Sequence, residues 1–565
     1  MATLTGAELL VRALRAEGVE TVFTLIGDHI LPIADAAVDH GLRFIDTRHE
    51  SAAMHMAEGW AQATGRVGVC LVTGGPGHAN VLPGLTVAWT SESPVVQISG
   101  RPELQHEGML AHQELDQIAM AAPISKAAWL VRRPADIPLV VARAFRLARA
   151  GRPGPIHLTI PLDVQEARVE PEALPPLPAA RLAHAPAAPA PGLVEQAVAL
   201  LRAAARPVAI VGTAARYAVA PGALAALAEA LRLPVFTVEQ ARGLLSDEHE
   251  LCFGYADPAL NAAARALREA DAVLLVGKRL DARIGYGRPP FLAADARVVQ
   301  VEAEPAEIGR NRGVDVAIES DLGAAVEALA AAARRVGAPT TPSEWLARLQ
   351  ALRAEHLAHL RTVAEDDAVP LHPMRVARAV EPLVDADTHV VLDGGDFVQW
   401  PRAYLPARRV GRWHRLGPLG HLGIGLPLAL GIQAAEPEAR VLLFIGDGSV
   451  GFYFMEWDTA VRHCLPIVAV LGNDATWGID NYFQLAYYGR AVATTLRSVR
   501  YDRLVAELGG YGEHVEQASE LAGALERAFA SRRPALIDVA VRRVPSPLGE
   551  AMAARRLAVR QGASD

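Results

Sequence analysis

Short apolar runs recur along the chain, and each is followed by small or polar residues. Runs of this length suit strands that are buried on both faces of a parallel sheet. Amphipathic segments separate them; the first covers 5–17, with Thr5 as the expected N-cap. The pattern predicts an α/β fold of doubly wound parallel sheets. The predicted strands cover 21–26, 42–46, 67–73, 94–99 and 156–160, then 208–211, 235–238, 272–276 and 298–301, and finally 389–392, 441–445, 467–471 and 535–541.

Two proline-rich stretches, at 166–192 and 337–342, separate the three groups of strands. Their composition is typical of linkers. A chain of 565 residues is also too long for one hydrophobic core. We therefore expect three α/β domains and a tail, at 1–170, 193–335, 368–543 and 544–565.

Composition narrows the class of protein. Hydrophobic residues make up 51% of the chain and charged residues 21%, as in an ordinary globular protein. The net charge of −8 gives no reason to expect a nucleic-acid or anionic-membrane partner. No basic segment with an apolar run behind it opens the chain, and no apolar stretch reaches ~18 residues, so we expect a cytoplasmic protein. Cys70, Cys252 and Cys464 are expected to be buried, reduced thiols.

The most informative stretch runs from Gly446 to Asp474. Gly446-Asp447-Gly448-Ser449 follows one apolar run, and Asn473-Asp474 follows the next. Glycine lets the backbone approach a phosphate, and carboxylates are hard oxygen ligands. Because neighbouring parallel strands end at one edge of a sheet, the stretch predicts a divalent metal bound to a diphosphate. The Gly-Asp-Gly tripeptide alone would fit a simple turn equally well.

As a whole, this stretch resembles the thiamine diphosphate fingerprint, which runs from Gly-Asp-Gly to Asn-Asn. Asp474 stands where that family has the second Asn. The resemblance implies thiamine diphosphate and Mg²⁺, with Asp447, Asp474 and the backbone carbonyl of Thr476 as metal ligands. The extra negative charge of Asp474 is expected to alter the electrostatics of the site.

The three predicted domains resemble the pyrimidine-binding, central Rossmann-like and diphosphate-binding domains of the acetohydroxyacid synthase superfamily. Within it, 46–50, 119–124 and 446–451 are similar to benzaldehyde lyase, and 393–397 is similar to bacterial 2-hydroxyacyl-CoA lyases. The resemblance implies a carbon–carbon lyase or carboligase. Its substrate would be a 2-hydroxyacyl-CoA or a 2-hydroxy ketone, with an aldehyde released or used.

The resemblance also assigns roles to residues around the cofactor. Glu50 would hold the aminopyrimidine in its imino form, Leu422 would wedge the cofactor into a bent shape, and the Gly420 carbonyl would meet the 4′-amino group. By itself Glu50 could be an exposed charge, and Leu422 could be a core residue. Further cofactor contacts are implied at Gly74, Pro76, Asn80, Gly394, Asp396, Gly446, Gly448, Ser449, Trp477 and Gly478.

Candidate proton-transfer groups point to two alternatives. His29 and Gln113 match the pair in benzaldehyde lyase, whereas Asp28, His112 and Asp480 resemble the acidic, multi-donor site of pyruvate decarboxylase. The same apparatus could therefore serve a 2-oxo-acid decarboxylase or an acetolactate-synthase-like acyl transferase. An inactive binding or regulatory paralogue would be expected to lack Glu50 or Asp447, and both are present.

Three further expectations concern partners. The turn Gly277-Lys278-Arg279-Leu280-Asp281 resembles the central domain of acetohydroxyacid synthase relatives, where ADP or FAD can lie; a surface Lys-Arg pair is the alternative. Family geometry implies a homo-oligomer, a dimer at least and a tetramer usually. Arg555, Arg556 and Arg560 on a helical tail could cover the active site or contact an acyl-CoA, or could simply be solvated.

Overall fold

The computed structural model describes residues 3–170, 186–337 and 343–560. The chain divides into two compact units. The first combines Met1–Ala185, Leu416–Glu438 and Tyr453–Leu465. The second combines Pro186–Arg415, Ala439–Phe452 and Pro466–Asp565.

Most of both predicted linkers lies outside the described residues, at 171–185 and 338–342, as does 561–565 of the predicted tail. The predicted three-domain boundaries divide the chain differently from the two compact units. These boundaries stay a prediction.

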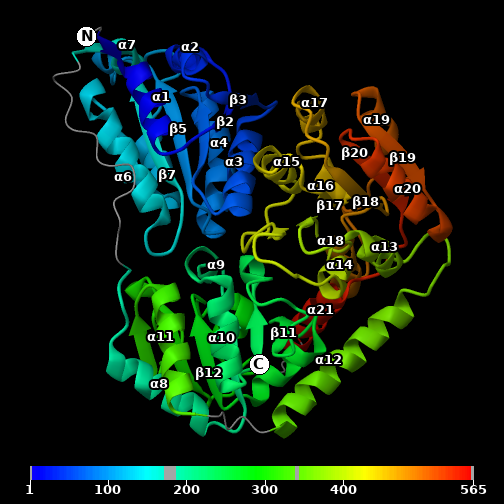
Figure 1. The fold of residues 1–565 in the computed structure, drawn as a ribbon. Coiled ribbons are helices and arrows are strands. Elements are labelled where there is room, and N and C mark those ends of the chain that lie inside the picture. The colour runs from blue at the N-terminus through cyan, green and yellow to red at the C-terminus, as the bar shows by residue number, and fades with distance from the viewer. Residues whose placement is uncertain (1–2, 171–185, 338–342, 561–565) are drawn as a thin grey trace. The chain divides into compact units, whose positions relative to one another are not determined.

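The first unit is built around one parallel sheet (Figure 1, blue to cyan). Its strands are β2 Thr21–Leu25, β3 Arg43–Asp46, β4 Gly68–Val72, β5 Val95–Arg101, β6 Ala127–Leu130 and β7 Ile156–Pro161. They lie in the order β3-β2-β4-β5-β7-β6, and every neighbouring pair is parallel. The main helices are α1 Gly6–Ala16, α3 Glu50–Thr64, α4 Pro76–Thr90 and α6 Ile137–Arg149. Helix α1 packs on α6, and α3 packs on α4.

Local sequence explains where the first helix begins. Thr5 Oγ1 accepts a hydrogen bond from the Glu8 amide at 3.1 Å, and the Glu8 carboxylate accepts one from the Thr5 amide at 2.6 Å. This reciprocal pair is a capping box, which satisfies two amides that the helix itself leaves without partners. The predicted N-cap is confirmed.

A close helix contact ties Leu416–Glu438 to the first sheet. Helix α15 (Gly425–Ala435) packs against α3, and a glycine lies at the contact on each side. A Cβ atom on Gly59 would lie 2.2 Å from the Leu428 carbonyl oxygen, and one on Gly431 would lie 2.0 Å from that of Met56. Only residues without a side chain allow the two backbones to approach this closely.

The second unit holds two more parallel sheets of six strands (Figure 1, green, and yellow to red). The first has the order β11-β10-β9-β12-β13-β14 and the second the order β16-β15-β17-β18-β20-β19. The first sheet consists of β9 Pro207–Val211, β10 Val235–Thr237, β11 Cys252–Tyr255, β12 Ala272–Val276, β13 Arg297–Glu302 and β14 Val316–Glu319. The second consists of β15 His389–Asp393, β16 Trp413–Arg415, β17 Val441–Gly446, β18 Val468–Asn473, β19 Tyr511–Val515 and β20 Ala535–Ala540.

Each predicted strand has a counterpart in these sheets, so the predicted fold class is confirmed. Within these three sheets, five strands were not predicted: β6, β11, β14, β16 and β19. All five are edge strands. They are short, at three to five residues, and an edge strand can also carry polar side chains, as β19 does at Glu513 and His514.

One expectation about the cysteines is wrong. Cys70 and Cys252 are buried free thiols, but Cys464 is exposed. It follows α17 (Glu456–Arg462) in a turn with a φ of 53°, at the surface between that helix and β18. None of the helices within the described ranges combines the length and the apolar character needed to cross a membrane.

We predict that Gly59→Ala lowers the melting temperature. The added methyl group would overlap the Leu428 carbonyl, and such overpacking costs ~1–3 kcal/mol, or roughly 2–10 °C for a folding unit of this size. Differential scanning fluorimetry would measure the shift. Gly192→Ala in α8 (Pro191–Ala203) is the matched control, because a Cβ atom there meets nothing within 4 Å. An unchanged melting temperature for Gly59→Ala would contradict the close contact.

Candidate functional site

Three loops of the second unit meet at one edge of its β15-containing sheet. They follow β15, β17 and β18, which are adjacent and parallel, so their carboxyl ends point the same way. Gly394 lies in the first loop, Gly446–Ser449 in the second and Asp474–Gly478 in the third. The sheet therefore brings together every residue that the fingerprint predicts in this half of the site.

Glycines let these loops touch. A Cβ atom on Gly448 would lie 2.7 Å from the Trp477 ring, and one on Gly394 would lie 3.3 Å from the Gly446 amide nitrogen and 3.7 Å from Ser449 Oγ. These contacts leave a cradle of backbone atoms at the start of the short helix Asp447–Val450. At Gly446 itself a Cβ atom would meet nothing within 4 Å, so there is space beside the cradle.

Asp447 carries the clearest sign of a bound cation. Its side chain is buried, and Oδ1 accepts a hydrogen bond from the Gly448 amide at 2.9 Å. Oδ2 is also buried, and within the described residues no donor is in good hydrogen-bonding geometry with it, although the backbone amides of Ala475 and Thr476 lie close enough to this carboxylate to lower its pKa. Burial, and then the nearby Asp474 carboxylate, raises the pKa of Asp447 to about 7. A divalent metal would supply the missing partner and favour the ionised form, so these residues fit Mg²⁺.

The third loop holds Asp474 in a tight turn. Asp474 Oδ1 accepts hydrogen bonds from the Thr476 amide at 3.0 Å and from Thr476 Oγ1 at 2.7 Å. Between them, Ala475 has a φ of 55°, a conformation that costs a non-glycine residue free energy. Burial raises the pKa of Asp474, and that of Asp396 to about 6. A Cβ atom on Gly478 would lie 3.1 Å from the Asp396 Cβ and 3.7 Å from Asp474 Oδ2.

Behind this turn, Asn473 is fixed by a residue that the sequence did not single out. Its side-chain amide donates to Asp538 Oδ1 and to the Val499 carbonyl, both at 3.0 Å. Asp538 is fully buried within its strand β20. Asp538 therefore positions the residue that precedes Asp474.

In the first unit, Glu50 is the first residue of α3. Its side chain is buried, and Oε2 accepts a hydrogen bond from the side-chain amide nitrogen of Asn80, Nδ2, at 3.0 Å. Asn80 is exposed, and its carbonyl accepts a hydrogen bond from the Ser51 hydroxyl. Glu50 and Asn80, which the resemblance places at one cofactor, are therefore neighbours in the structure.

The turn Gly74-Gly75-Pro76 precedes α4 and lies beside Gln113. Gly75 has a φ of 59°, and a Cβ atom there would lie 2.5 Å from the Gln113 Cβ. Gln117, which was not predicted, holds this turn: its Oε1 accepts from the Gly75 amide at 3.3 Å, and its Nε2 donates to the Gly100 carbonyl at 3.1 Å.

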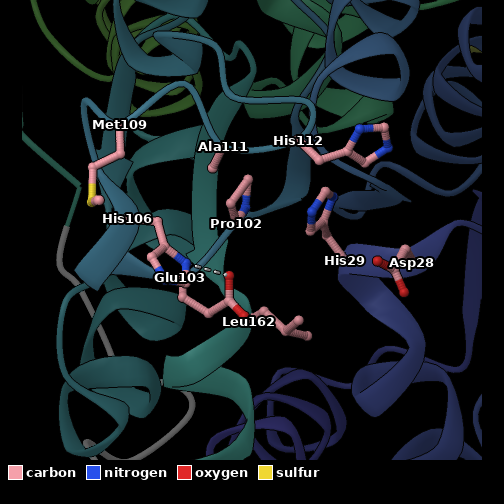
Figure 2. Close-up of a pocket in the computed structure, with 9 residues that line it drawn as sticks. All are labelled: Asp28, His29, Pro102, Glu103, His106, Met109, Ala111, His112 and Leu162. Atoms are coloured by element: carbon pink, nitrogen blue, oxygen red, sulfur yellow. Dashed lines mark hydrogen bonds and ion pairs between the residues drawn. The ribbon is translucent and has the colours of Figure 1, made fainter.

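Asp28, His29 and His112 line one cavity of about 390 Å³ in the first unit (Figure 2). His29 is buried, and its Nδ1 lies 3.4 Å from Thr73 Oγ1. Burial lowers the pKa of His29, so its imidazole is neutral at neutral pH and can accept a proton. Three of the candidate proton-transfer residues therefore share one space, which Glu103 and His106 also line although neither was predicted.

The remaining candidates, Leu422, Gly420 and Asp480, do not line this cavity. Leu422 is half-buried and packs against Val87, Leu416 and Ile424 in the first unit. Gly420 has a φ of 69°, where glycine is favoured. In the second unit, Asp480 is exposed in the first turn of α18 (Gly478–Tyr488). The structure leaves the wedge role of Leu422 and the proton-transfer role of Asp480 as predictions.

The cations of the predicted nucleotide turn have carboxylate partners. Lys278 Nζ lies 2.6 Å from Asp281, and Arg279 Nε lies 3.1 Å from Glu307. These ion pairs favour the structural alternative for the turn. ADP or FAD in the central domain stays a prediction.

The tail forms helix α21 (Pro547–Arg560), as predicted for its arginines. The guanidinium of Arg560 lies over the Tyr487 and Tyr488 rings of α18, and its Nη1 donates to the Tyr487 carbonyl at 3.3 Å. The Ser546 amide, just before the helix, donates to Asp396 Oδ1 at 2.9 Å. The tail thus contacts a predicted cofactor residue through Ser546, just before its helix, while its role toward substrate is a prediction.

Three family models match the chain in order. They describe the N-terminal TPP binding domain of thiamine pyrophosphate enzymes at residues 4–120, their central domain at 194–329 and their C-terminal TPP binding domain at 393–539. TPP is thiamine diphosphate under its other name. Glu50 falls in the first match, and Asp447 and Asp474 fall in the third.

Similar proteins of known name fall into two groups. An acetolactate synthase large subunit of Mycobacterium tuberculosis is 37% identical over 544 residues, which cover 95% of this chain and 96% of that protein. The 2-hydroxyacyl-CoA lyase 2 of Caenorhabditis elegans is 31% identical, over 91% of this chain and 85% of that protein. The 2-hydroxyacyl-CoA lyase 2 of Bos taurus is 32% identical, over 92% and 86%.

We predict that Asp447→Asn removes the stabilisation that Mg²⁺ and thiamine diphosphate give together. At a ligand concentration 100 times the Kd, the free energy of unfolding of the wild-type protein should rise by ~2.7 kcal/mol. The variant should gain almost nothing at the same concentrations, because a charged ligand of the metal is lost. Without ligands its melting temperature should not fall, because a crowded buried carboxylate becomes a neutral amide. Thermal scans with and without the ligands would measure both effects.

The matched control is Asp387→Asn, which removes an exposed carboxylate from the loop before β15. When Mg²⁺ and thiamine diphosphate are added, the melting temperature of Asp387→Asn should rise as much as that of wild type. An Asp447→Asn variant that still responds to Mg²⁺ as wild type does would rule out Asp447 as a metal ligand.

Proposed function

The chain belongs to the thiamine pyrophosphate enzymes, and on this basis we propose that it is a carbon–carbon lyase or carboligase that breaks or forms the bond beside a carbonyl group. Its substrates would be 2-hydroxyacyl-CoA thioesters or 2-hydroxy ketones, with an aldehyde as the second product or reactant. The observation that supports this choice is the buried, neutral His29 beside a cavity.

Bound thiamine diphosphate would supply a carbon nucleophile and an electron sink for this chemistry. Asp447, Asp474 and the Thr476 carbonyl would hold Mg²⁺. Gly446, Gly448 and Ser449 would contact the diphosphate through the cradle that the loops form. Asp447 Oδ2 supports this assignment, because it is a buried carboxylate oxygen without a hydrogen-bond donor in the described residues, and a cation would stabilise it.

Glu50 would act on the aminopyrimidine. A buried carboxyl group that shares a proton with a ring nitrogen keeps the ring in its imino form, and Asn80 orients that carboxyl group through one of its two oxygens. Residue 77 is a glycine, which leaves space beside the other carboxylate oxygen of Glu50. A Cβ atom on Gly77 would lie 3.7 Å from Glu50 Oε1.

The choice of a lyase rests on proton transfer. When a 2-hydroxy compound is cleaved, its hydroxyl group must lose a proton as the C–C bond breaks and the aldehyde carbonyl forms. A neutral imidazole such as His29 can accept that proton and return it in the ligation direction. Gln113, beside the Gly75 turn, would hydrogen-bond the substrate oxygen. Loss of CO₂ from a 2-oxo acid needs no such base.

The alternative is an acetolactate-synthase-like transferase or a 2-oxo-acid decarboxylase. The 37% identity to a protein named acetolactate synthase favours it. Asp28, His112 and Asp480 would then protonate the product carbon. An inactive paralogue is the weaker proposal, because Glu50 keeps its Asn80 partner and Asp447 keeps its place in the cradle.

We also propose how the protein is assembled and where it works. Its active site would form in a homo-oligomer, a dimer at least and a tetramer usually, as the resemblance implies. The compartment would be the cytoplasm. Sedimentation at several protein concentrations would test the assembly.

The test of the lyase proposal is a substrate panel. The enzyme with thiamine diphosphate and Mg²⁺ would be incubated in turn with a 2-hydroxyacyl-CoA, benzoin and pyruvate, and aldehyde and CO₂ would be measured. We expect aldehyde from the first two substrates at rates well above CO₂ release from pyruvate. CO₂ or acetolactate from pyruvate without aldehyde from the others would establish the alternative.

We predict that Glu50→Gln lowers turnover by roughly 10²–10⁴-fold, the usual contribution of a positioned acid–base group. Because the side chain keeps its size, the thermal shift with thiamine diphosphate and Mg²⁺ should remain. Loss of hydrogen–deuterium exchange at the cofactor C2, measured by NMR after acid quench, would locate the defect in activation. Glu20→Gln, at an exposed position, is the control. Unchanged exchange in Glu50→Gln would refute the role of Glu50.

A further inference from the structure

The cavity beside His29 has an unusual set of charged groups. Figure 2 shows Glu103 and His106 joined on one side and Asp28, His29 and His112 on the other, with Pro102 and Ala111 between them. Two carboxyl groups and three imidazoles line the cavity, and neither lysine nor arginine is among its nine lining residues. The site thus contains no permanently charged cation.

The carboxylate of Glu103 is fixed and ionised. Its oxygen lies 3.3 Å from His106 Nδ1, and the Glu103 side chain is about one third exposed. A hydrogen bond from its own backbone amide, and then the His106 ring, lower the pKa of Glu103. At neutral pH the group therefore keeps its negative charge.

The nearest arginine in sequence is already paired. Arg101 Nη1 lies 3.1 Å from Glu107 Oε1, and its Nη2 lies 3.8 Å from Glu114 Oε1. The positive charge of Arg101 is therefore paired with Glu107 and Glu114, neither of which lines the cavity. Nothing in the lining would compensate the charge of a carboxylate ligand except an imidazole that first takes up a proton.

The rest of the lining is apolar. Pro102, Met109, Ala111 and Leu162 contribute it, and the volume of about 390 Å³ would admit a phenyl ring or a branched alkyl group. Met109 is exposed and its unbranched side chain can adapt to ligands of different shape. The cavity thus offers an apolar wall together with hydrogen-bonding groups.

We propose that this cavity selects uncharged carbonyl compounds over carboxylates, and that Glu103 is a specificity-determining residue of the enzyme. The inference rests on the proposed function and narrows its substrate class to aldehydes and acyl groups without a free carboxylate. An anion that entered would meet Asp28 and Glu103 without a permanent counter-ion, and like-charge contact of this kind is a common means of rejecting a ligand.

The proposal is tested with a matched pair of unreactive probes, benzamide and benzoate, which have the same size and differ in charge. Diethyl pyrocarbonate labels exposed histidines, and peptide mass spectrometry would follow His106 and His112, with the exposed His359 as an internal reference. In the holoenzyme, benzamide should slow labelling of His106 and His112 severalfold. Benzoate at the same concentration should leave it unchanged.

The variant Glu103→Gln keeps a group that can accept a hydrogen bond from His106 but removes the charge. It should bind benzoate about tenfold more tightly than wild type does, while benzamide protection stays the same. Glu166→Gln is the matched control, because Glu166 is exposed on the same short helix as Leu162, at Leu162–Glu166, and does not line the cavity. It should behave as wild type.

Equal protection by benzoate and benzamide in wild-type protein, no protection by benzamide, or no gain of benzoate binding in Glu103→Gln would overturn the proposal. The labelling needs no turnover, so these outcomes are separate from failure of the proposed function. That failure is read from the substrate panel alone, as an absence of aldehyde release.

Discussion

Crowding of buried carboxyl groups is the constraint around which the proposed metal site of the second unit is built. Asp447 lies in the short helix after β17 and Asp474 in the turn after β18, and the parallel register fixes the ends of those strands side by side. Burial, and then Asp474, raises the pKa of Asp447, and one of its oxygens is left without a donor in the described part of the chain. Two carboxylates this close together are electrostatically unfavourable by themselves, and a divalent cation between them would offset the repulsion. Glycine at 394 and 448 is a consequence of the same arrangement, because the loops must approach one another.

In the first unit, the two candidate acid–base groups are buried beside polar partners. Glu50 and His29 are both buried, but each has a polar neighbour, Asn80 for the carboxyl group and Thr73 for the imidazole. Burial lowers the pKa of His29 and so keeps its imidazole in the neutral form at neutral pH. The close packing of α3 on α15, through Gly59 and Gly431, holds the helix that Glu50 begins.

These two units support a common proposal. The proposed metal cradle would hold the cofactor in any reaction of the family. In our proposal the cavity beside His29 favours a lyase over a decarboxylase, because it combines a neutral base with carboxylates and has neither lysine nor arginine among its lining residues. The relatives include proteins named acetolactate synthase and proteins named 2-hydroxyacyl-CoA lyase 2, so overall identity does not separate these two activities. We propose that the charge of the cavity does.

The sequence by itself determined the class of fold, the central strands and the fingerprint residues. Central strands such as β4 and β17 are continuous apolar runs because both faces are covered, and Asp447 and Asp474 follow such runs directly. Resemblance to a family supplied Glu50 and His29. Five of the six edge strands were missed, because they are short and some, such as β19, carry polar residues. Only the tertiary structure identified Gln117, Asp538, Glu103 and His106. Gln117 and Asp538 contact residues far away in the sequence. Glu103 and His106 are of interest only because they line a cavity whose walls come from three separate segments. Burial, orphaned oxygens and the balance of charge around a cavity arise when distant segments meet, so no local pattern in the chain could have encoded them.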